Sequence, residues 1–393
     1  MRRVVVYNVA FFKLSETFIY RQIKGISGQF LVSLLGFTFQ NEKLFTISMA
    51  EKLKIPPISL LDKIITRLFR KVLKRKSKFS FFNTLFINSV LRRKDVCVIH
   101  AHYGGNGLRI MNLAKRNRIP LIVSFHGKDA SAALKKESYK KQLPGLFDYA
   151  SAIIVSSPHM IETLNLGNVI DKVHIIPYGV DTVDFQPEIV PRLMKDGISI
   201  LHAGRIVPKK GVPDVITVFA ALKTKYPDLQ LHILGDGQER KHCEVLVSRH
   251  NLGGSVFFYG AQPQPIVKDL MRACDIFVLN SRTDDSGDME GLPNTILEAM
   301  SLEKAVVSTY HAGIPQAIRS GINGLLVPER DNAQLTIALE TLITDASLRE
   351  ILGKNARQTI LQDFTIEKMQ ERLYEVLSAV DTPTKKVTQV HKI

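Results

Sequence analysis

The hydrophobic positions of the chain fall into short runs that alternate with longer segments of helical periodicity. Each run is rich in β-branched residues and nearly continuous in hydrophobicity, as in parallel strands that are covered on both faces. In the first half we expect strands at 4–9, 29–37, 96–101, 121–124, 153–156 and 173–176, and helices at 107–117 and 157–164. In the second half we expect strands at 198–202, 230–234, 256–259, 276–279 and 305–308, and helices at 213–226, 238–250, 265–273, 293–301 and 333–344.

Two separate series of alternating strands and helices predict an α/β protein with two doubly wound, Rossmann-like domains. A length of 393 residues suits two domains of ordinary size. The carboxyl ends of the strands should face a central cleft, where such sheets bind ligands. We expect an N-terminal domain at 1–188, a C-terminal domain at 189–365, a helix at 366–381 that returns to the N-terminal domain, and a mobile tail at 382–393.

The excess of positive over negative charge lies entirely in the first half of the chain. The formal net charge is +16, and residues 1–190 hold 29 Lys and Arg against 13 Asp and Glu, whereas residues 191–393 hold 24 of each. This asymmetry predicts an anionic partner for the first half, either a membrane surface or a nucleic acid. No nucleic-acid-binding motif accompanies the charge, so we do not expect nucleic acid to be the partner.

Apolar and basic residues are interleaved with helical spacing in the segment 60–94. Apolar pairs recur every four residues from Leu60 to Leu73, and lysines and arginines occupy positions between them. This pattern predicts an amphipathic helix whose basic face rests on an anionic membrane. The alternative is an ordinary helix that packs its apolar side into the core and leaves its basic side in water.

No segment is long and apolar enough to predict a transmembrane helix. The longest uncharged run, 25–41, contains polar residues and glycines and falls short of the ~20 apolar residues that a spanning helix needs. Cys97, Cys243 and Cys274 have no metal-ligand or CxxC spacing and suit buried thiols in a reducing compartment. We expect a cytoplasmic protein that is peripheral on the inner face of the cytoplasmic membrane.

The segment from Glu290 to Glu298 carries the strongest chemical signal. It follows the strand expected at 276–279 and a polar loop, and Pro293 suits the first turn of a helix. The free amides around Gly291–Asn294 would point into the cleft and could hold an anion or sugar hydroxyls. Glu298 lies in an apolar helical stretch, where a carboxylate needs a partner, and a ribose diol would be a suitable one.

A second signal follows the strand expected at 198–202 and consists of Gly204 and Arg205, then Lys210 and Gly211. A glycine-flanked turn at this position lets the backbone approach a phosphate closely. Arg205 and Lys210 would neutralise a diphosphate. Such fixed cations stabilise a leaving nucleoside diphosphate more in the transition state than in the ground state.

Together these motifs resemble the second domain of the family 4 glycosyltransferases, which have the GT-B fold. The family pattern is present in order: GR…KKG at 204–211, LGDG at 234–237, two glutamates at 290 and 298, and NGLLVP at 323–328. The resemblance covers about residues 95–380 and is specific as a set. It implies a retaining glycosyltransferase that moves a sugar from a nucleotide-sugar donor to a saccharide acceptor, with no obligatory metal or other cofactor.

The resemblance also assigns roles to residues. Arg205 and Lys210 would bind the diphosphate, Glu290 and the amides after it the donor sugar, and Glu298 the ribose. His126 would hydrogen-bond the donor sugar near the reacting centre, the alternative being a structural histidine. The expected donor-binding residues are Arg205, Lys210, Gly235, Gly237, Phe258, Tyr259, Gly260, Glu290, Gly291, Leu292, Pro293, Asn294 and Glu298, and the expected catalytic residues are His126, Glu290, Arg205 and Lys210.

The acceptor is expected on the N-terminal domain, near His102, Ser15 and Glu16. We expect His100 and His102, which are separated by one residue, to point to opposite faces of their strand, with His102 in the cleft. A metal site shared by the two is therefore not expected. The segment 177–181 also matches the family, either as a turn that shapes the hinge between the domains or as part of the binding site.

The loop after the first strand departs from the family pattern. Many members have glycines there, near the diphosphate, whereas residues 8–18 contain none. The Ser-Glu-Thr-Phe run at 15–18 instead resembles a subset that builds bacterial exopolysaccharides, such as the colanic-acid-type enzymes. This subset implies a role in cell-surface polysaccharide biosynthesis, and an anionic membrane as a partner would suit an acceptor that is a lipid-linked saccharide.

Other activities agree less well with these residues. An NAD-dependent dehydrogenase would need a GxGxxG motif after a first strand, which neither half has. Asp284, Asp285 and Asp288 have a spacing seen at metal sites of a different transferase fold, but a flexible polar loop explains them, since Arg205 and Lys210 already supply positive charge. The remaining alternatives are a nucleotide-sugar epimerase or another GT-B-type enzyme, and a non-enzymatic membrane-associated scaffold, which would bind no nucleotide sugar.

Overall fold

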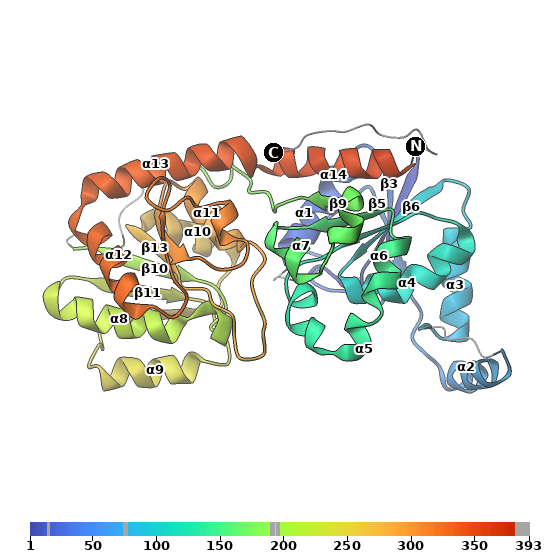
Figure 1. Cartoon of the computed structure of the whole chain (residues 1–393), viewed down its shortest axis with the longest axis horizontal. Helices are drawn as coiled ribbons and strands as arrows, with labels where there is room; N and C mark the ends of the chain where they lie inside the picture. The colour runs from blue at the N-terminus through green and yellow to red at the C-terminus, as the bar shows by residue number, and fades with distance from the viewer. Residues whose placement is uncertain (14–15, 74–77, 189–192, 194–196, 382–393) are drawn as a thin grey trace.

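The computed structural model describes residues 1–13, 16–73, 78–188, 193 and 197–381, and it contains two α/β units, each built on its own sheet (Figure 1). The first sheet has seven strands in the order β5-β3-β1-β6-β7-β8-β9, and the second has six in the order β12-β11-β10-β13-β14-β15. Neighbouring strands are parallel throughout both sheets. The expected pair of doubly wound, Rossmann-like domains is confirmed.

The first unit contains every strand that the hydrophobic runs predict. Its strands are β1 (Arg3–Tyr7), β2 (Ala10–Phe11), β3 (Leu31–Gly36), β4 (Thr38–Phe39), β5 (Ala50–Lys54), β6 (Val96–His102), β7 (Leu121–Ser124), β8 (Ala152–Val155) and β9 (Val173–Ile175). Its helices are α1 (Thr17–Ile26), α2 (Leu60–Leu73), α3 (Phe81–Leu91), α4 (Gly104–Asn117), α5 (Glu137–Lys140), α6 (Leu143–Tyr149) and α7 (His159–Thr163). The edge strand β5 was not predicted, because its AEKLK sequence is half exposed and lacks a hydrophobic run.

The second unit contains every element predicted for it, each to within two residues, and it also has β15 and α13, which were not predicted. Its strands are β10 (Ser199–Ala203), β11 (Gln230–Leu234), β12 (Val256–Gly260), β13 (Ile276–Leu279), β14 (Ala305–Thr309) and β15 (Leu325–Val327). Its helices are α8 (Val212–Lys225), α9 (Arg240–Arg249), α10 (Gln264–Ala273), α11 (Asn294–Ser301), α12 (Asn332–Thr344) and α13 (Ala346–Asp363), and α14 (Ile366–Asp381) follows.

Side chains of a strand alternate between the two faces of its sheet. In β1, Val4 and Val6 belong to the apolar cluster on one face, whereas Val5 and Tyr7 belong to the cluster on the other. All four side chains are fully buried. This burial on both faces is the reason that the strand reads as an uninterrupted hydrophobic run.

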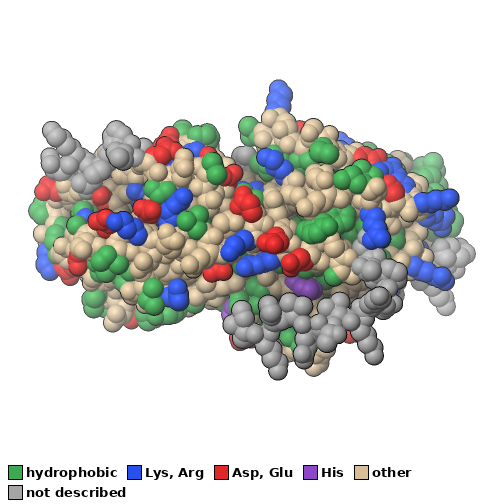
Figure 2. All heavy atoms as spheres, turned by 90° about the horizontal axis from the view of Figure 1, so that it is seen from above, with side chains coloured by type: hydrophobic (Ala, Val, Ile, Leu, Met, Phe, Trp, Pro, Cys, Tyr) green, Lys and Arg blue, Asp and Glu red, His purple; other side chains and the backbone are tan. Residues whose placement is uncertain are grey.

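The chain crosses between the two units twice, and the two crossings pair with each other. The Val180 amide donates to the Phe364 carbonyl at 2.9 Å, and the Ile366 amide donates to the Val180 carbonyl at 3.0 Å. Gly179 allows this approach, because a Cβ there would lie 2.6 Å from the Cα of Ile366. Beyond the second crossing, α14 packs along α1 of the first unit, so that α13 and α14 span both units (Figure 1). Acidic and basic side chains are interspersed on the face that carries these helices (Figure 2).

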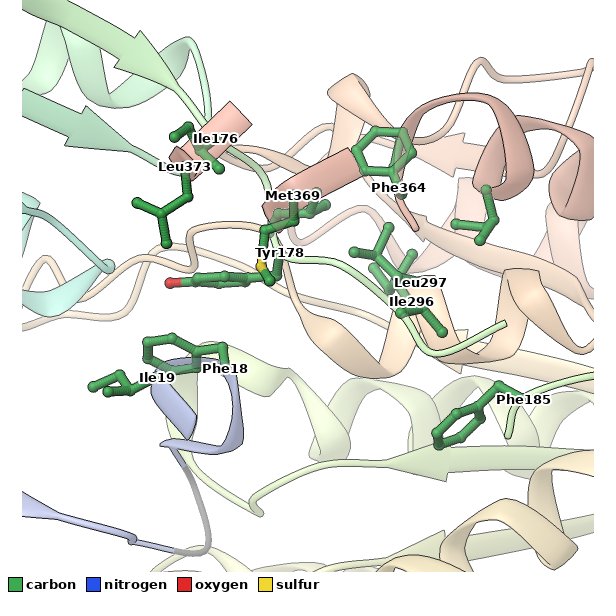
Figure 3. Close-up of a cluster of buried hydrophobic side chains, with 14 of the residues drawn as sticks. Phe18, Ile19, Ile176, Tyr178, Phe185, Ile296, Leu297, Phe364, Met369 and Leu373 are labelled. Carbon is green, nitrogen blue, oxygen red and sulfur yellow. The ribbon is translucent and has the colours of Figure 1, made fainter. Parts of the chain in front are cut away.

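An apolar cluster joins the two units beside these crossings (Figure 3). Phe18, Ile19 and Tyr178 of the first unit belong to the same buried group as Ile296 and Leu297 of the second. The contact between the units is therefore hydrophobic on this side, and the polar groups that face between the units gather elsewhere.

Several expectations fall wholly or partly outside the described residues: Ser15, the tail at 382–393, part of the basic segment at 60–94, and part of the chain that follows the domain boundary expected at 188. Among the helices that the structure describes, none combines the length and the apolar composition that crossing a bilayer requires. The three cysteines are free thiols, and those of Cys243 and Cys274 are buried.

Candidate active site

A cavity of about 810 Å³ lies between the two units, at the carboxyl ends of their central strands. Open parallel sheets bind their ligands at this position. We call its two sides the N-terminal and C-terminal walls. The N-terminal wall consists of Asn8, Val9, Lys13, Glu16, Phe18, Tyr103, Gly105, Asn106, His126, Lys128, Asp129, Ala133, Lys136, Tyr139 and Tyr178, and the C-terminal wall consists of Gly204, Arg205, Lys209, Lys210, Glu290, Gly291, Leu292, Pro293, Asn294 and Thr295.

Glu290 lies between two lysines on the C-terminal wall. Its Oε1 is 3.3 Å from Nζ of Lys210 and 3.4 Å from Nζ of Lys209. Burial by itself would raise the pKa of Glu290, but the ammonium groups of Lys210 and Lys209 outweigh it and lower that pKa to about 2. Burial also lowers the pKa of Lys210 from its ordinary value, although the charge of Glu290 opposes this. Glu290 is therefore an anion at neutral pH and is held in place by opposite charges.

Lys209 is a site residue that the sequence interpretation missed. Besides Glu290, its ammonium group lies 3.2 Å from Oδ1 of Asp288 and 3.2 Å from the Met289 carbonyl oxygen. It thereby ties the loop before Glu290 to the loop after β10. Two consecutive lysines precede Gly211, and the sequence alone cannot tell how they divide the contacts.

The acidic loop at 284–288 is a hydrogen-bonded turn. Oδ1 of Asp284 accepts from the Ser286 hydroxyl at 2.6 Å and from the Asp288 amide at 2.9 Å. Asp288 pairs with Lys209, and Asp285 lies 3.5 Å from Arg330. Each of these carboxylates therefore already has a protein partner, in agreement with the polar loop that we expected.

Arg205 presents an exposed side chain to the cavity and has no ion-pair partner within the described part of the chain. Gly235 and Gly237, which we expected to line the same cleft, lie behind the Arg205 loop and are absent from the wall. A Cβ on Gly235, whose φ is +130°, would lie 1.9 Å from the Gly204 carbonyl oxygen. This glycine therefore allows two loops to touch, and it supports the position of Arg205 from behind.

The residues expected near the base, Phe258, Tyr259 and Gly260, also lie outside the cavity wall. The Tyr259 hydroxyl is 2.9 Å from Nδ1 of His232, and the Arg240 guanidinium lies 5.4 Å from the centre of the Phe258 ring. Contact between these residues and a nucleotide stays a prediction.

Glu298 pairs with an arginine of the first unit. Its side chain is buried in α11, does not line the cavity, and lies 3.7 Å from Nη2 of Arg21 in α1. Burial raises the pKa of Glu298, although the nearby charge of Arg21 opposes the rise. Arg21 is thus a partner for this buried carboxylate, and contact between Glu298 and a ribose stays a prediction.

A buried chain of hydrogen bonds through His311 to Glu329, which we call the His311 relay, holds the backbone of Glu290. Its amide donates to Nε2 of His311 at 3.0 Å, and Nδ1 of His311 lies 2.5 Å from Oε1 of Glu329. Because Nε2 accepts, this network assigns the imidazole proton to Nδ1, which donates to the carboxylate. Nothing in the sequence pattern singled out His311, since its role depends on a strand end and a loop 18 residues further on.

His126 occupies the centre of the N-terminal wall with both ring nitrogens engaged. Nδ1 is 3.0 Å from the Tyr178 hydroxyl, and Nε2 is 3.0 Å from Nδ1 of His102. Burial lowers the pKa of His126 to about 3, with the charge of His100 adding to the effect. The imidazole is therefore neutral at physiological pH. Tyr178 comes from the 177–181 segment, so that segment contributes both to the hinge and to the cavity.

The expectation for His100 and His102 was wrong. Residues i and i+2 of a strand share a face, and the two rings lie 4.4 Å apart in β6. His102 is fully buried and does not line the cavity, which it reaches only through His126. Within the described ranges, no group of three or more His, Cys, Asp or Glu residues is arranged to hold a metal ion. Independence from metals stays a prediction.

Asp129 fixes the geometry beneath His126. Its Oδ1 accepts from the His126 amide and its Oδ2 from the Gly104 amide, each at 2.9 Å. Burial raises the pKa of Asp129 to about 6, although these amide hydrogen bonds oppose the rise. The carboxylate thereby joins the end of β7 to the start of α4. A short acidic residue three positions after a histidine was the available signal, and the sequence interpretation did not use it.

Of the residues expected near the acceptor, Glu16 lines the cavity. Its Oε1 lies 2.8 Å from Nζ of Lys13. Tyr103 adjoins it on the same wall with a φ of +72°, a conformation that is rare for a bulky residue. The sequence interpretation did not identify Tyr103, because a single backbone angle leaves no trace in a hydrophobic pattern.

Known families match both units. Residues 53–184 match the description Glycosyltransferase Family 4, and residues 188–359 match Glycosyl transferases group 1. The chain is 31% identical over 296 residues to the putative colanic acid biosynthesis glycosyltransferase WcaL of Escherichia coli, covering 73% of this chain and 71% of that protein. It is 29% identical over 249 residues to the amylovoran biosynthesis glycosyltransferase AmsK of Erwinia amylovora, covering 62% and 60%.

Solved structures share the fold at lower identity. Anabaena Alr3699/HepE, in complex with UDP and glucose, has a TM-score of 0.79 at 18% identity, with 96% of this chain and 100% of that chain covered. Sucrose-phosphate synthase from Thermosynechococcus elongatus has a TM-score of 0.79 at 18% identity, with 97% and 99% covered. The chain belongs to the family 4 glycosyltransferases with the GT-B fold, in the group that contains the colanic acid and amylovoran relatives.

Proposed function

We propose that this glycosyltransferase binds a nucleotide-sugar donor on its C-terminal wall and transfers the sugar, with retention of configuration, to a saccharide acceptor on its N-terminal wall. The observation that carries the proposal is the cluster of Arg205, Lys209, Lys210 and Glu290 in one cavity. Three cations and one carboxylate suit an anionic leaving group beside a polar, uncharged sugar.

In this mechanism Arg205 and Lys210 hold the diphosphate. The charge on the diphosphate grows as the glycosidic bond breaks, and cations that are already in place stabilise that growth without rearranging. Because these residues supply positive charge, we propose that transfer needs no metal ion or other cofactor, and chelation by EDTA should leave the rate unchanged.

Glu290, the amides at the start of α11 and His126 would position the donor sugar. A carboxylate accepts hydrogen bonds from sugar hydroxyls, whereas free amides at a helix start donate. His126 is neutral and does not repel the cations opposite, and it would bond to a sugar hydroxyl by exchanging its contact with Tyr178 or His102. Arg21 lies near one oxygen of Glu298, and we propose that the carboxylate also accepts from the ribose hydroxyls.

The biological role is proposed from the relatives. The names of WcaL and AmsK assign those proteins to colanic acid and amylovoran biosynthesis. By the same chemistry we propose that this chain adds a sugar during bacterial cell-surface polysaccharide biosynthesis, at the inner face of the cytoplasmic membrane, and that its acceptor is a lipid-linked saccharide.

The helix α2 supports the membrane part of the proposal. Leu60, Leu61, Ile64 and Leu68 are each about half exposed or more, which supports a partner on this side of the helix. Lys63 and Arg67 are exposed between them, and the basic residues expected at 74–76 lie outside the described residues. In Figure 1, α2 lies at the far end of the first unit, away from the second. Apolar side chains beside cations suit a surface of anionic lipid.

A vesicle-binding assay tests the membrane part. Ile64→Glu with Leu68→Glu places two negative charges on the exposed side of α2 and should abolish cosedimentation with phosphatidylglycerol vesicles. The control, Ile337→Glu with Ile351→Glu, makes the same change at exposed positions on α12 and α13 and should leave binding intact. Equal binding by both variants would remove the membrane from the proposal.

A thermal-shift screen against UDP-, GDP-, ADP- and dTDP-sugars tests the donor part. A ligand at 100 times its dissociation constant adds about 2.7 kcal/mol of stability, which gives a readily visible shift. A shift with one base identifies the donor class. The absence of any shift would favour the non-enzymatic scaffold.

A further inference from the structure

We propose that the acceptor carries a negative charge, and that Lys128 and Lys136 form the subsite on the N-terminal wall that binds it. This inference rests on the proposed function, because it places the acceptor opposite the donor in the same cavity. It adds a substrate class: a saccharide with an anionic group, either a uronic acid carboxylate or the diphosphate of a lipid link.

The two lysines are the cations of the N-terminal wall that no carboxylate neutralises. Both side chains are exposed, both line the cavity, and neither has an ion-pair partner among the residues that the structure describes. The third lysine of this wall, Lys13, is paired with Glu16 at 2.8 Å. The wall therefore has three lysines against the carboxyl groups of Glu16 and Asp129, and Lys128 and Lys136 are the lysines without an ion pair among the described residues.

The acidic neighbours of the two lysines in the sequence have other partners, although Asp129 also lines the cavity. Asp129, beside Lys128, is buried, and its two oxygens accept from backbone amides. Glu137, beside Lys136, has a side chain that is 71% exposed and lies 4.0 Å from Lys141. Each lysine thus has a nearby carboxylate in sequence, but the fold commits that carboxylate elsewhere.

The C-terminal wall has cations of its own for the donor. There Arg205, Lys209 and Lys210 are available to the diphosphate of a donor, beside the carboxylates of Glu290 and, at Lys209, Asp288. Lys128 and Lys136 lie on the other wall, in addition to that set. A second anionic ligand in the same cavity is the simplest occupant for them.

Contacts between the units hold the lysine-bearing segment in place. Nζ of Lys135 donates to the Asp285 carbonyl at 3.1 Å, and the Met289 amide donates to the Ser131 hydroxyl at 3.2 Å. The segment from Ser131 to Lys136 is therefore fixed against the loop that precedes Glu290. Several positive charges in a partly enclosed cleft produce a concentrated positive electrostatic potential, which attracts an anion before it docks.

The test compares Lys128→Gln with Lys136→Gln against a matched control, Lys140→Gln with Lys141→Gln. The control removes two exposed lysines from the same region that do not line this cavity. Binding is measured by isothermal titration in the presence of the nucleoside diphosphate that stabilises the protein most. One pair of probes is cellobiouronic acid and cellobiose, and the other is glucose joined to farnesol through a diphosphate and through a simple glycosidic bond.

For at least one pair, the charged probe should bind wild type and control about tenfold more tightly than its neutral counterpart, and the ratio should fall to about twofold or less in Lys128→Gln with Lys136→Gln. The wild-type preference should shrink as salt is raised. The pair that shows the effect identifies the source of the charge, a carboxylate or a diphosphate.

Three results would overturn the inference: no detectable binding of either charged probe, no preference for charge, or a preference that the double variant keeps. A thermal shift with nucleotide sugar is measured on the same samples. If that shift is present and the charge preference is absent, only this inference fails, whereas the absence of any shift in wild type is a failure of the proposed function.

Discussion

The two walls of the cavity hold their polar groups by different means. On the C-terminal wall opposite charges stabilise each other, since Lys210 and Glu290 lie 3.3 Å apart and each favours the charged form of the other. On the N-terminal wall the central group is neutral, because His126 is buried and exchanges hydrogen bonds with Tyr178 and His102. This difference indicates that the C-terminal wall suits a ligand with formal charge, whereas the centre of the N-terminal wall suits hydroxyl groups.

Removing charge from the C-terminal wall should have the largest effect. Lys210→Ala should lower the rate of nucleoside diphosphate release by about 10²- to 10³-fold, because a fixed cation beside the leaving group is lost. The melting temperature should stay close to that of wild type, since Lys209 remains 3.4 Å from Glu290. Lys354→Ala on α13, which removes an exposed lysine paired with Glu350, serves as the control and should change neither quantity.

Removing the neutral centre of the N-terminal wall should have a smaller effect. His126→Ala should lower the same rate by about 10- to 100-fold, because the donor sugar loses one positioned hydrogen bond. Tyr178→Phe keeps the ring and removes only the hydroxyl that contacts His126, so its loss should be smaller than that of His126→Ala. A wild-type rate in His126→Ala would show that this histidine has only a structural role.

Lowering the pH should reduce the free energy of unfolding in two separate ranges, one for the buried histidines and one for Glu290. Burial lowers the pKa of His100 to about 4 and that of His126 to about 3, so the unfolded chain, with ordinary values near 6.5, binds more protons below that pH. The stability due to these neutral rings is present above pH 6.5 and is lost as the pH falls toward 4. Each of the two histidines should lower the free energy of unfolding by up to about 2 kcal/mol between pH 6.5 and 5.

The pairing of Glu290 responds in a lower window. Its folded pKa of about 2 lies below the ordinary 4.5, so its contribution is present above pH 4.5 and is lost only as the pH falls from there toward 2. Urea unfolding at pH 7, 6 and 5 measures the combined effect of the buried histidines, which Asp129, with a folded pKa of about 6, partly offsets. A midpoint that stays constant over this range would show that the buried imidazoles are not held neutral.

The relay behind Glu290 should have the smallest effect of the four. His311→Ala removes the acceptor for the Glu290 amide and should weaken nucleotide-sugar binding by about three- to tenfold. Binding of the nucleoside diphosphate alone should change little, because Arg205 and Lys210 are untouched. An equal loss for both ligands would indicate general damage to the fold and would contradict a positioning role for His311.

The sequence predicted most strands of both sheets because these strands are buried on two faces and therefore appear as continuous hydrophobic runs, whereas the edge strands β5 and β15 were not predicted. It also predicted which motifs meet, since the carboxyl ends of parallel strands share one edge. Arg205, Lys210, Glu290 and His126 were brought into one cavity for this reason.

Contacts between the units left no such pattern. The pairing of Glu298 with Arg21 depends on how α1 approaches α11, and the relay through His311 depends on the path of the loop that carries Glu329. The division of work between Lys209 and Lys210 depends on side-chain directions within one turn. These are three-dimensional facts that spacing along the chain does not encode.

The most direct test of the account is a titration of wild type, Lys210→Ala and Lys128→Gln with Lys136→Gln with the nucleotide sugar that gives the largest thermal shift. The account predicts that Lys210→Ala loses at least about tenfold in affinity, as expected for a lost charged contact, while the N-terminal wall variant keeps the wild-type value. Undiminished affinity in Lys210→Ala, or an equal loss in both variants, would contradict the assignment of the donor to the C-terminal wall.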